Sequence, residues 1–423
     1  MKNNKKLIAI VAAIVLALIG LIVYIMKDSN EVTTTQNPSG QLVNFQGADL
    51  QEEKDGKLVW ALSAEKIEYD PRTKAIVLTN LKGLFYQDDV TTTITAPHAV
   101  LTGDRNSLDI DQGVTATNTE GAEFKTEALH FDNKTKTLTS KTAFTYNSKD
   151  VTLTGDKLEG NMSLKIIKAI GNAKLTKKQL RGNMMNKKKQ IGMAILAVLM
   201  TASVTAWAAN DPLTISADTL SYDGNTGRAD ATGNVVITQA DKTMTGAKGW
   251  YNTKTQEANL DGGVSMIGSD MAMSAQTVHS YNNNKFTANG SVHLQRADRQ
   301  IFGDSVEYST DSEYGLVTGN ARLIAEGTTL TGDKVEGWMK EVRAVAQGNV
   351  TFSNPERNVS GSADRATYTQ TPNQNDGVVL LSGSAHAVQN GNVLNAPELK
   401  IRLADDSAET LGGRSTLVIV PNK

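Results

Sequence analysis

The feature that most constrains this chain is a regular repeat of small residues in its second half. Gly or Ala recurs every 28 to 33 residues, within segments such as Ala217–Tyr222 and Gly303–Tyr308, which share the pattern small-Asp-x-apolar-x-Tyr. A fixed period in this range predicts a repeat architecture rather than an ordinary globular core. The anchor positions are Ala217, Gly246, Ala275, Gly303, Gly332, Ala363 and Ala396.

A second series of glycines alternates with the first and precedes apolar residues at every second position. Such alternation predicts strands with one buried face, and we expect each of these glycines to open a short strand. Clusters of Gly, Asn and Asp, such as 223–227 and 282–285, predict the turns between strands. The series comprises Gly233, Gly262, Gly290, Gly319, Gly348 and Gly383.

Each run is about a dozen residues long, which is twice the usual strand length, and a small residue inside a strand marks a bend. We therefore predict an all-β chain of long antiparallel strands, each bent at its Gly or Ala so that its halves lie in two facing sheets. The inner surface between them would form an apolar trough. A weaker copy of the pattern, as in Ala64–Tyr69 and Gly155–Gly160, precedes residue 180. The chain thus divides into two β-blocks, 40–183 and 209–423, with 28–39 as a linker.

Composition excludes several functions. The chain has no cysteine, so a disulfide, a thiolate nucleophile or a cysteine-ligated zinc site is impossible. Its Lys and Arg residues, 43 in all, do not exceed its 45 acidic residues, which disfavours a nucleic-acid partner. It also lacks the Gly-x-x-x-x-Gly-Lys-Ser/Thr motif of nucleotide-binding loops.

Two hydrophobic segments predict targeting. Residues 7–26 are uncharged and long enough to span a bilayer, and lysines precede them, so we expect residues 1–27 to form a transmembrane anchor with a cytoplasmic amino terminus. Residues 184–208 read as a signal peptide, with three lysines, an apolar stretch and a cleavage site at Ala206-Trp-Ala208. This internal segment indicates either a natural fusion that retains an old signal or two separate exported proteins joined in one sequence. The alternative is that residues 184–208 form only a hydrophobic linker helix.

A family resemblance follows from these features. An anchor followed by a degenerate β-block resembles LptC. A signal peptide followed by Ile215–Tyr222, Ala231–Ile237 and Leu330–Gly337 resembles LptA of the OstA family. The resemblance implies two elongated, twisted β-jellyroll blocks that transport lipopolysaccharide, with no cofactor. The carboxy-terminal half would be periplasmic and the protein anchored by a single pass in the inner membrane.

The resemblance also implies partners. An inner-membrane ABC transporter would supply the lipid, and an outer-membrane LptD-like translocon would receive it. Other LptA-like units would add through edge strands. We expect the strand near 171–175 to be the edge that the first block offers to the second. Residues 211–222 would form the first edge of the second block, and 415–420 its last, covered on both faces or paired with another chain.

The apolar positions of the repeats are candidates for lipid contact, although the same positions could serve only as core. We predict that acyl chains contact the alternating positions Val235, Ile237, Val264, Met266, Val292, Leu294, Val306, Tyr308, Leu323, Val350 and Phe352.

Polar residues give no catalytic constellation. The Gly-Asp-x-x-Glu segments at 155–159, 303–307 and 332–336 could suggest paired catalytic carboxylates, but they recur at the repeat spacing, so we interpret them as solvent-facing strand positions. The five histidines lack the spacing of metal ligands. We therefore expect no enzyme and no metal site. The alternatives are an adhesive β-repeat protein and a carbohydrate-active enzyme on a repetitive scaffold.

Overall fold

The computed structural model describes residues 43–177 and 212–419. The predicted anchor at 7–26 and the signal-like segment at 184–208 lie outside the described residues. Within the described ranges, no helix is long and apolar enough to cross a membrane. Short gaps interrupt the description at 55–56, 88–89, 105, 133, 136, 150, 162–165, 224–225, 270, 282–283, 298, 326, 373, 375 and 405–406.

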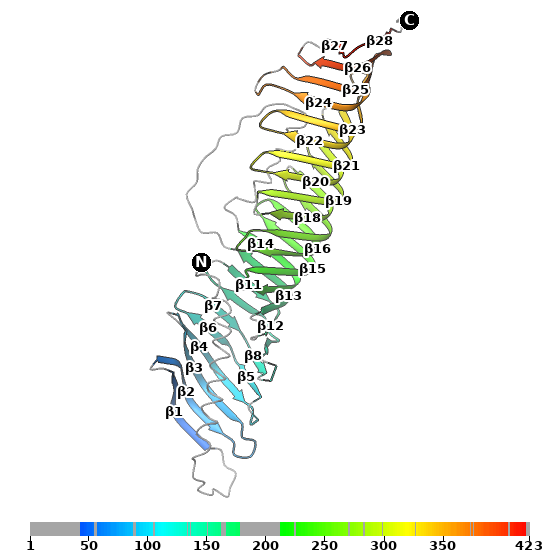
Figure 1. Ribbon diagram of the computed structural model, residues 1–423. Coiled ribbons are helices and arrows are strands. Elements are labelled where there is room, and N and C mark those ends of the chain that lie inside the picture. The colour runs from blue at the N-terminus through cyan, green and yellow to red at the C-terminus, as the bar shows by residue number, and fades with distance from the viewer. Residues whose placement is uncertain are drawn as a thin grey trace. The chain divides into compact units, whose positions relative to one another are not determined.

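Every regular element described is a β-strand, in agreement with the predicted all-β class (Figure 1). The chain divides into two compact units, one with residues 43–177, 212–235 and 250–254 and the other with residues 236–249 and 255–419 of the described chain. The strands of the first block are β1 (Val43–Lys54), β2 (Lys57–Tyr69), β3 (Ile76–Gln87), β4 (Val90–Leu101), β5 (Ser107–Asp111), β6 (Val114–Asn118), β7 (Glu123–Thr126), β8 (Leu129–Asp132), β9 (Thr137–Ser140), β10 (Phe144–Asn147), β11 (Val151–Gly155), β12 (Lys157–Asn161) and β13 (Ile166–Lys177).

The second block continues with long strands. They are β14 (Leu213–Asp223), β15 (Arg228–Gln239), β16 (Lys242–Asn252), β17 (Ala258–Ile267), β18 (Met271–Tyr281), β19 (Lys285–Arg296), β20 (Arg299–Ser309), β21 (Tyr314–Ala325), β22 (Thr328–Trp338), β23 (Arg343–Asn354), β24 (Val359–Thr369), β25 (Val378–Gln389) and β26 (Asn392–Arg402), followed by the short β27 (Ser407–Leu411) and β28 (Thr416–Val418).

In the first unit, β1 to β4 are long strands that pair antiparallel in chain order. Beyond β4 each strand is broken into two short ones. One set pairs in the order β4, β6, β7, β10, β11 and β13, and the other in the order β4, β5, β8, β9, β12 and β13. Side chains from both sets, including Phe124 and Phe131, are almost fully buried. The broken strands therefore form two sheets that share β4 and β13.

The last strand of the first block pairs with the first strand of the second. β13 and β14 run antiparallel, from Ile166 opposite Asp223 to Lys177 opposite Leu213. The Lys177 Nζ also donates a 3.2 Å hydrogen bond to the hydroxyl of Tyr251, and both residues belong to the first unit. This confirms the expectation that the strand near 171–175 meets residues 211–222, so neither strand is a free edge.

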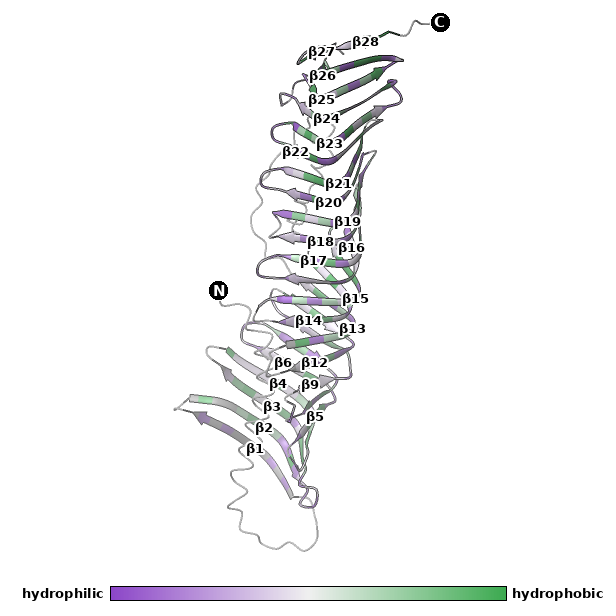
Figure 2. Ribbon diagram, turned by 45° about the vertical axis from the view of Figure 1, so that its right-hand side comes forward, coloured by the Kyte–Doolittle hydropathy of each residue, from purple (hydrophilic) through white to green (hydrophobic). Residues whose placement is uncertain are grey.

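In the second unit, β17 to β26 form a meander in which each strand pairs antiparallel with the next. Figure 2 shows hydrophilic and hydrophobic segments alternating along these strands. β18 ends at Tyr281 and β19 begins at Lys285. The meander keeps one face of every strand available for an apolar interior.

The second glycine series does not open strands, as the sequence had suggested, but lies in the middle of continuous ones. Gly319 (φ 69°) and Asn320 (φ 50°) are consecutive left-handed residues within β21, and the register with β20 shifts there. Gly348 (φ 72°) and Asn349 (φ 49°) repeat this in β23. Two such residues form a β-bulge, which bends the strand. The apolar runs that follow are therefore the second halves of bent strands.

An aspartate on the neighbouring strand closes each of these bulges. Asn349 Nδ2 donates to Asp333 Oδ2 at 3.0 Å, and the same contact joins Asn320 to Asp304 at 3.2 Å. The partners are always 16 residues apart, and Asn172 with Asp156 and Asn234 with Asp218 repeat the arrangement. The aspartates are exposed, as the sequence interpretation expected, but they fasten the bend rather than only facing solvent.

The first series of small residues has a different physical cause. Gly303 lies in β20 without a left-handed φ, but a Cβ there would lie 2.6 Å from Cγ1 of Val317. At Gly246 an added Cβ would lie 2.8 Å from Cγ of Leu260. At Gly303 and Gly246 a neighbouring side chain approaches the backbone closely, which favours a small residue, whereas an added Cβ at Gly332 would meet nothing nearer than Gln347 O at 3.4 Å.

Candidate functional site

A continuous row of apolar residues crosses the inward face of the second unit. Residues directly opposite each other in antiparallel strands point to the same side of the sheet, so the registers define the row. We call it the inner row; it runs through Met266, Met273, Leu294, Ile301, Leu323, Leu330, Phe352, Gly361, Ala387, Leu394 and Leu417. In the predicted arrangement, this row would line one side of the trough.

A second row crosses the other half of the same strands. We call it the aromatic row; it runs through Ala258, Ser280, Phe286, Tyr308, Gly315, Gly337, Ala344, Tyr368, Val379 and Ile401. Near β24 to β26, residues from both halves pack into one cluster in which Phe352 and Leu394 meet Leu381 and Leu399. The two halves of each strand therefore face one another there, as predicted.

The candidate residues differ in accessibility. All of them face inward, and nine are buried, with exposed fractions from 1% for Val235, Leu323 and Val350 to 8% for Tyr308. Val264, Val292 and Val306, which lie beside the bend, expose only 2 to 3% of their surface. Leu294 and Phe352 alone among the candidates are partly exposed. A ligand could reach these two without displacing the core.

Two further accessible residues were missed by the sequence reasoning. Leu330 and Leu394 belong to the inner row and are partly exposed. Each lies two residues before a small residue of the first series, Gly332 or Ala396. The prediction had followed mainly the apolar runs that come after the second glycine series. The signal was present in the sequence, since Met244, Met273 and Ile301 occupy the equivalent place.

Phe352 shapes the trough through its neighbour. Opposite it stands Gly361, where a Cβ would lie 2.5 Å from Cζ of Phe352 and 2.4 Å from the carbonyl oxygen of His386. The absent side chain lets the ring lie across β24. Ala387, next in the row, is also small, so Phe352 has Leu330 on one side and two small residues in succession on the other.

The interior has the low polarity that acyl chains require. Burial raises the pKa of the Tyr308 phenol, and the nearby charge of Glu313 adds to the effect. Tyr308 stands in the aromatic row between Phe286 and Gly315. The raised pKa thus follows from the burial of Tyr308 in this row.

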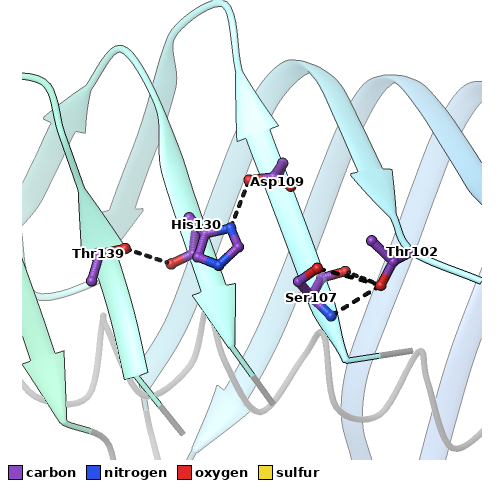
Figure 3. Close-up of polar contacts among 5 residues, drawn as sticks. All are labelled: Thr102, Ser107, Asp109, His130 and Thr139. Carbon is purple, nitrogen blue, oxygen red and sulfur yellow. Dashed lines mark hydrogen bonds and ion pairs between the residues drawn. The ribbon is translucent and has the colours of Figure 1, made fainter. Parts of the chain in front are cut away.

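In the first block, charged and polar pairs lie on the outward face of the strands. His130 Nδ1 lies 2.7 Å from Asp109 Oδ1, and the Thr139 hydroxyl lies 3.5 Å from the His130 carbonyl oxygen (Figure 3). His98 and Asp111 form a second pair at 2.7 Å. In the ranges that the structure describes, no group of three or more His, Cys, Asp or Glu could hold a metal ion.

The two tryptophans of the second block also face outward. Each neighbours buried inward residues, and each carries a guanidinium on its ring, Arg228 at 4.5 Å from Trp250 and Arg343 at 4.4 Å from Trp338. They pack on the outside of the sheet rather than closing an end of the trough.

The carboxy-terminal segment was predicted to be either covered on both faces or paired with another chain, and it does not have the first of these forms. β28 pairs with part of β26, but Leu417, Val418 and Ile419 expose 59%, 49% and 68% of their surface. The segment is therefore not covered on both faces.

Comparison with known proteins matches each block to a family model. Residues 7–177 match the model of "Lipopolysaccharide-assembly, LptC-related" proteins. Residues 214–341 and 272–406 match that of the "LptA/(LptD N-terminal domain) LPS transport protein". The two matched families agree with the resemblance of the repeats and targeting segments to LptC and LptA.

Other comparisons add little. No curated protein matches the sequence. Among solved structures, the crystal structure of LptH, the LptA homologous periplasmic component of the lipopolysaccharide transport device from Pseudomonas aeruginosa, is 15% identical, with a TM-score of 0.25, and the match covers 27% of this chain and 95% of that one. A likeness of this extent carries no weight for function.

Proposed function

We propose that this chain, in which an LptC-related domain precedes an LptA/LptD N-terminal type domain, carries lipopolysaccharide across the periplasm with the acyl chains inside its apolar trough. The observation that carries the proposal is the inner row, which continues from strand to strand in the second unit and is partly exposed at Leu294, Leu330 and Phe352. A lipid binder needs both the continuity and the exposure.

The energy of lipid exposure supports the need for such a row. Burial is worth roughly 0.8 kcal/mol per CH₂, so an acyl chain of about a dozen carbons costs on the order of 9 kcal/mol to expose to water. A lipid with several chains cannot cross an aqueous compartment unshielded. A continuous apolar surface removes this cost at every step of the path.

The finer assignment concerns direction and partners. In this proposal, residues 7–26 anchor the protein in the inner membrane and its β-domains are periplasmic. An inner-membrane ABC transporter supplies the lipid and the energy, and an outer-membrane LptD-like translocon receives it. In this proposal, the apolar side chains exposed at β28 suit strand addition by a further LptA-like unit or by the translocon.

Photo-crosslinking tests the lipid path. A benzophenone amino acid at Leu294 or Phe352, in the full chain expressed in its native envelope, should form an adduct with lipopolysaccharide. The matched controls are the adjacent outward residues Gln295 and Thr351, which are exposed and should form none. Adducts at the controls only, or at none of the four positions, would overturn the proposal in favour of a scaffold without lipid.

An immunoblot of the envelope tests whether the two domains stay joined. An antibody to the second block should detect a band at the full-length mass of 45.3 kDa if a single chain works as an anchored conduit. A band near half that mass would mean that the two domains act as separate proteins.

A further inference from the structure

One bulge of the second unit lacks the side-chain bond that closes four others. In β13, β15, β21 and β23 an Asp–Asn hydrogen bond joins residues 16 positions apart, as between Asp333 and Asn349. In β17 the same spacing pairs Ala247 with Gly263, and neither residue has a side chain that can form a hydrogen bond. The bend of β17 is therefore not closed by an Asp–Asn bond.

The bulge itself is present in β17. Gly262 (φ 86°) and Gly263 (φ 77°) are consecutive left-handed residues, and the register with β18 shifts between Asp261 and Val264. A Cβ at Gly262 would lie 2.5 Å from Cβ of Ala247, so the alanine takes the place that an aspartate has elsewhere. Both glycines are exposed. The strand thus bends as the others do, without their side-chain bond.

The residue that covers the left-handed glycine is polar at the other bulges. Ala247 alone in the set has no polar side-chain atom. In β19, where a glutamine covers the glycine, the Ser305 hydroxyl donates to Asn289 Oδ1 at 2.7 Å and links β19 to β20 instead. The polar covering residues are Asp156, Asp218, Gln276, Asp304, Asp333 and Asp364.

A second glycine adds backbone freedom at the same bend. Other bulges have asparagine or serine after the left-handed glycine, whereas β17 has Gly263, around which an added Cβ would find no atom within 4 Å. Glycine has more accessible backbone conformations than any other residue. Exposed backbone with few side-chain contacts opens at low free energy. The bend of β17 therefore has the features of a locally unstable point.

The inner face beside this bend is lined by methionine. Met266 stands opposite Met273, and Met244 and Met271 are also buried, so that these four side chains expose 3 to 8% of their surface. From β19 to β22 leucine and isoleucine occupy the inner row. Methionine is unbranched and has three rotatable bonds, so it repacks more readily than leucine or isoleucine. The interior can thus follow a change in the bend.

The strand ends beyond the bulge are connected. Asp241 Oδ2 accepts hydrogen bonds from the backbone amide of Ser269 at 3.2 Å and from its hydroxyl at 2.5 Å. This contact joins the turn after β15 to the turn after β17. A change at β17 is therefore expected at the bend, while these turns stay together.

From these observations we propose that the bulge of β17 is a joint at which the two halves of this strand open, and that the opening admits an acyl chain to the methionine-lined part of the inner face. The bulges of β21 and β23, with their Asp–Asn bonds, stay closed. The joint is a property of the fold alone. The admission of an acyl chain rests on the proposed lipid transport.

Hydrogen exchange of the full chain tests the joint. After correction for intrinsic rates, the amides of β17 should exchange about tenfold faster than those of β23, as expected for a missing hydrogen bond to a charged group. Ala247→Asp with Gly263→Asn restores the pair at its usual spacing and should slow β17 to the rate of β23. Asparagine tolerates the left-handed conformation. Ala247→Asp by itself has no asparagine to bond and should leave the rate unchanged.

The reciprocal exchange of residues keeps the test independent of how well one variant folds. Asp333→Ala with Asn349→Gly gives β23 the residues of β17, and its amides should then exchange as fast as those of β17 in the wild type. Equal rates for β17 and β23 in the wild type would overturn the joint. Unchanged rates in both double variants would also overturn it.

Lipid uptake tests what the joint admits. The rate at which the full chain takes up lipid A from detergent micelles should fall about tenfold in Ala247→Asp with Gly263→Asn, in proportion to the smaller open population. Ala247→Asp by itself should keep the wild-type rate. Slowed exchange in β17 with unchanged uptake would overturn the admission of lipid at this joint and leave lipid transport standing. A wild-type protein that takes up no lipid A would overturn the proposed function, and the admission with it.

Discussion

The two blocks bend their strands by different means. Between β4 and β13 of the first block the chain breaks at the bend, so that β7 and β8, or β9 and β10, are separate short strands in different sheets. β13 itself keeps the bulge at Gly171 and Asn172. In the second block strands such as β21 and β23 run through the bend as single elements with a bulge. The same two-sheet arrangement is therefore reached in two ways. The strand either ends at the bend or continues through it with a bulge.

The broken strands are held by buried hydroxyl groups. Thr126 Oγ1 lies 2.9 Å from Ser140 Oγ and 2.9 Å from Thr142 Oγ1, and it donates to Ala143 O at 3.1 Å. These residues end β7 and β9 or lie just beyond, where the ladder is interrupted. The bulged strands use backbone conformation instead, with a left-handed Gly and an Asp–Asn hydrogen bond. A continuous strand keeps its backbone hydrogen bonds to neighbouring strands on both sides of the bend. It therefore needs glycine at the left-handed position of the bulge.

The strongest test of this comparison is Gly348→Ala in β23. The residue has a left-handed φ of 72°, and a Cβ there would lie 2.3 Å from Asp333 Oδ2. We expect the second block to lose about 2–3 kcal/mol of stability, from the backbone conformation and the clash together. The measurement is the urea midpoint of the full chain, followed through tryptophan fluorescence.

Gly332→Ala in the adjacent strand is the matched control. Its added Cβ would have Gln347 O as nearest neighbour, at 3.4 Å, which is an ordinary contact. Little change is expected. If Gly348→Ala is as mild as this control, the bend does not depend on a left-handed glycine and the distinction between the two series disappears.

A smaller effect is expected from Thr126→Val in the first block. Valine keeps the shape of threonine but removes the hydroxyl contacts with Ser140, Thr142 and the Ala143 carbonyl oxygen, so that Ser140 and Thr142 keep their bonds to each other but lose those to residue 126. This loss costs about 1–2 kcal/mol. The measurement is hydrogen exchange of the amides in β7 to β10, which should become faster while β17 to β26 stay unchanged. Equal acceleration in both sets of strands would mean that the hydroxyl cluster does not act locally.

The smallest effect concerns a turn of the first block between β4 and β5. Hydrogen bonds from the Asn106 side chain, the Thr102 hydroxyl and the Asn106 amide lower the pKa of Asp104 from 3.8 to about 2. Because the folded pKa is the lower one, the contribution to stability is complete above pH 3.8 and is lost as the pH falls toward 2. A carboxyl NMR titration should show this value, and Asn106→Ala should raise it. A wild-type value near 3.8 would contradict the contacts at this turn.

Much of the architecture could be predicted from periodicity. The small-residue repeat predicted long bent antiparallel strands, and the segment near 171–175 was correctly expected to meet 211–222. The position predicted for the second glycine series was wrong, because these glycines lie within strands and do not begin them. A glycine before an apolar run reads equally as the start of a strand or as a bulge, because φ is not visible in sequence. The 16-residue spacing of Asp333 and Asn349 carried the missing signal.

The sequence predicted on which side of each strand the candidate residues lie, but not which of them are exposed. All the proposed contact residues point inward, since alternation fixes the side of a strand on which a residue lies. Alternation cannot separate Val292, buried at 2%, from Leu294, which is partly exposed two residues further along the same strand. That difference depends on how near the facing half-strand approaches, which involves residues distant in sequence.

The sequence by itself determined that this protein is a β-repeat with an apolar inner face and no cysteine chemistry, because period and composition are local properties. Only the tertiary structure decided which bend uses a left-handed glycine and which inner residues are partly exposed. Those features arise from strand register and from the approach of facing halves, and no single strand carries them.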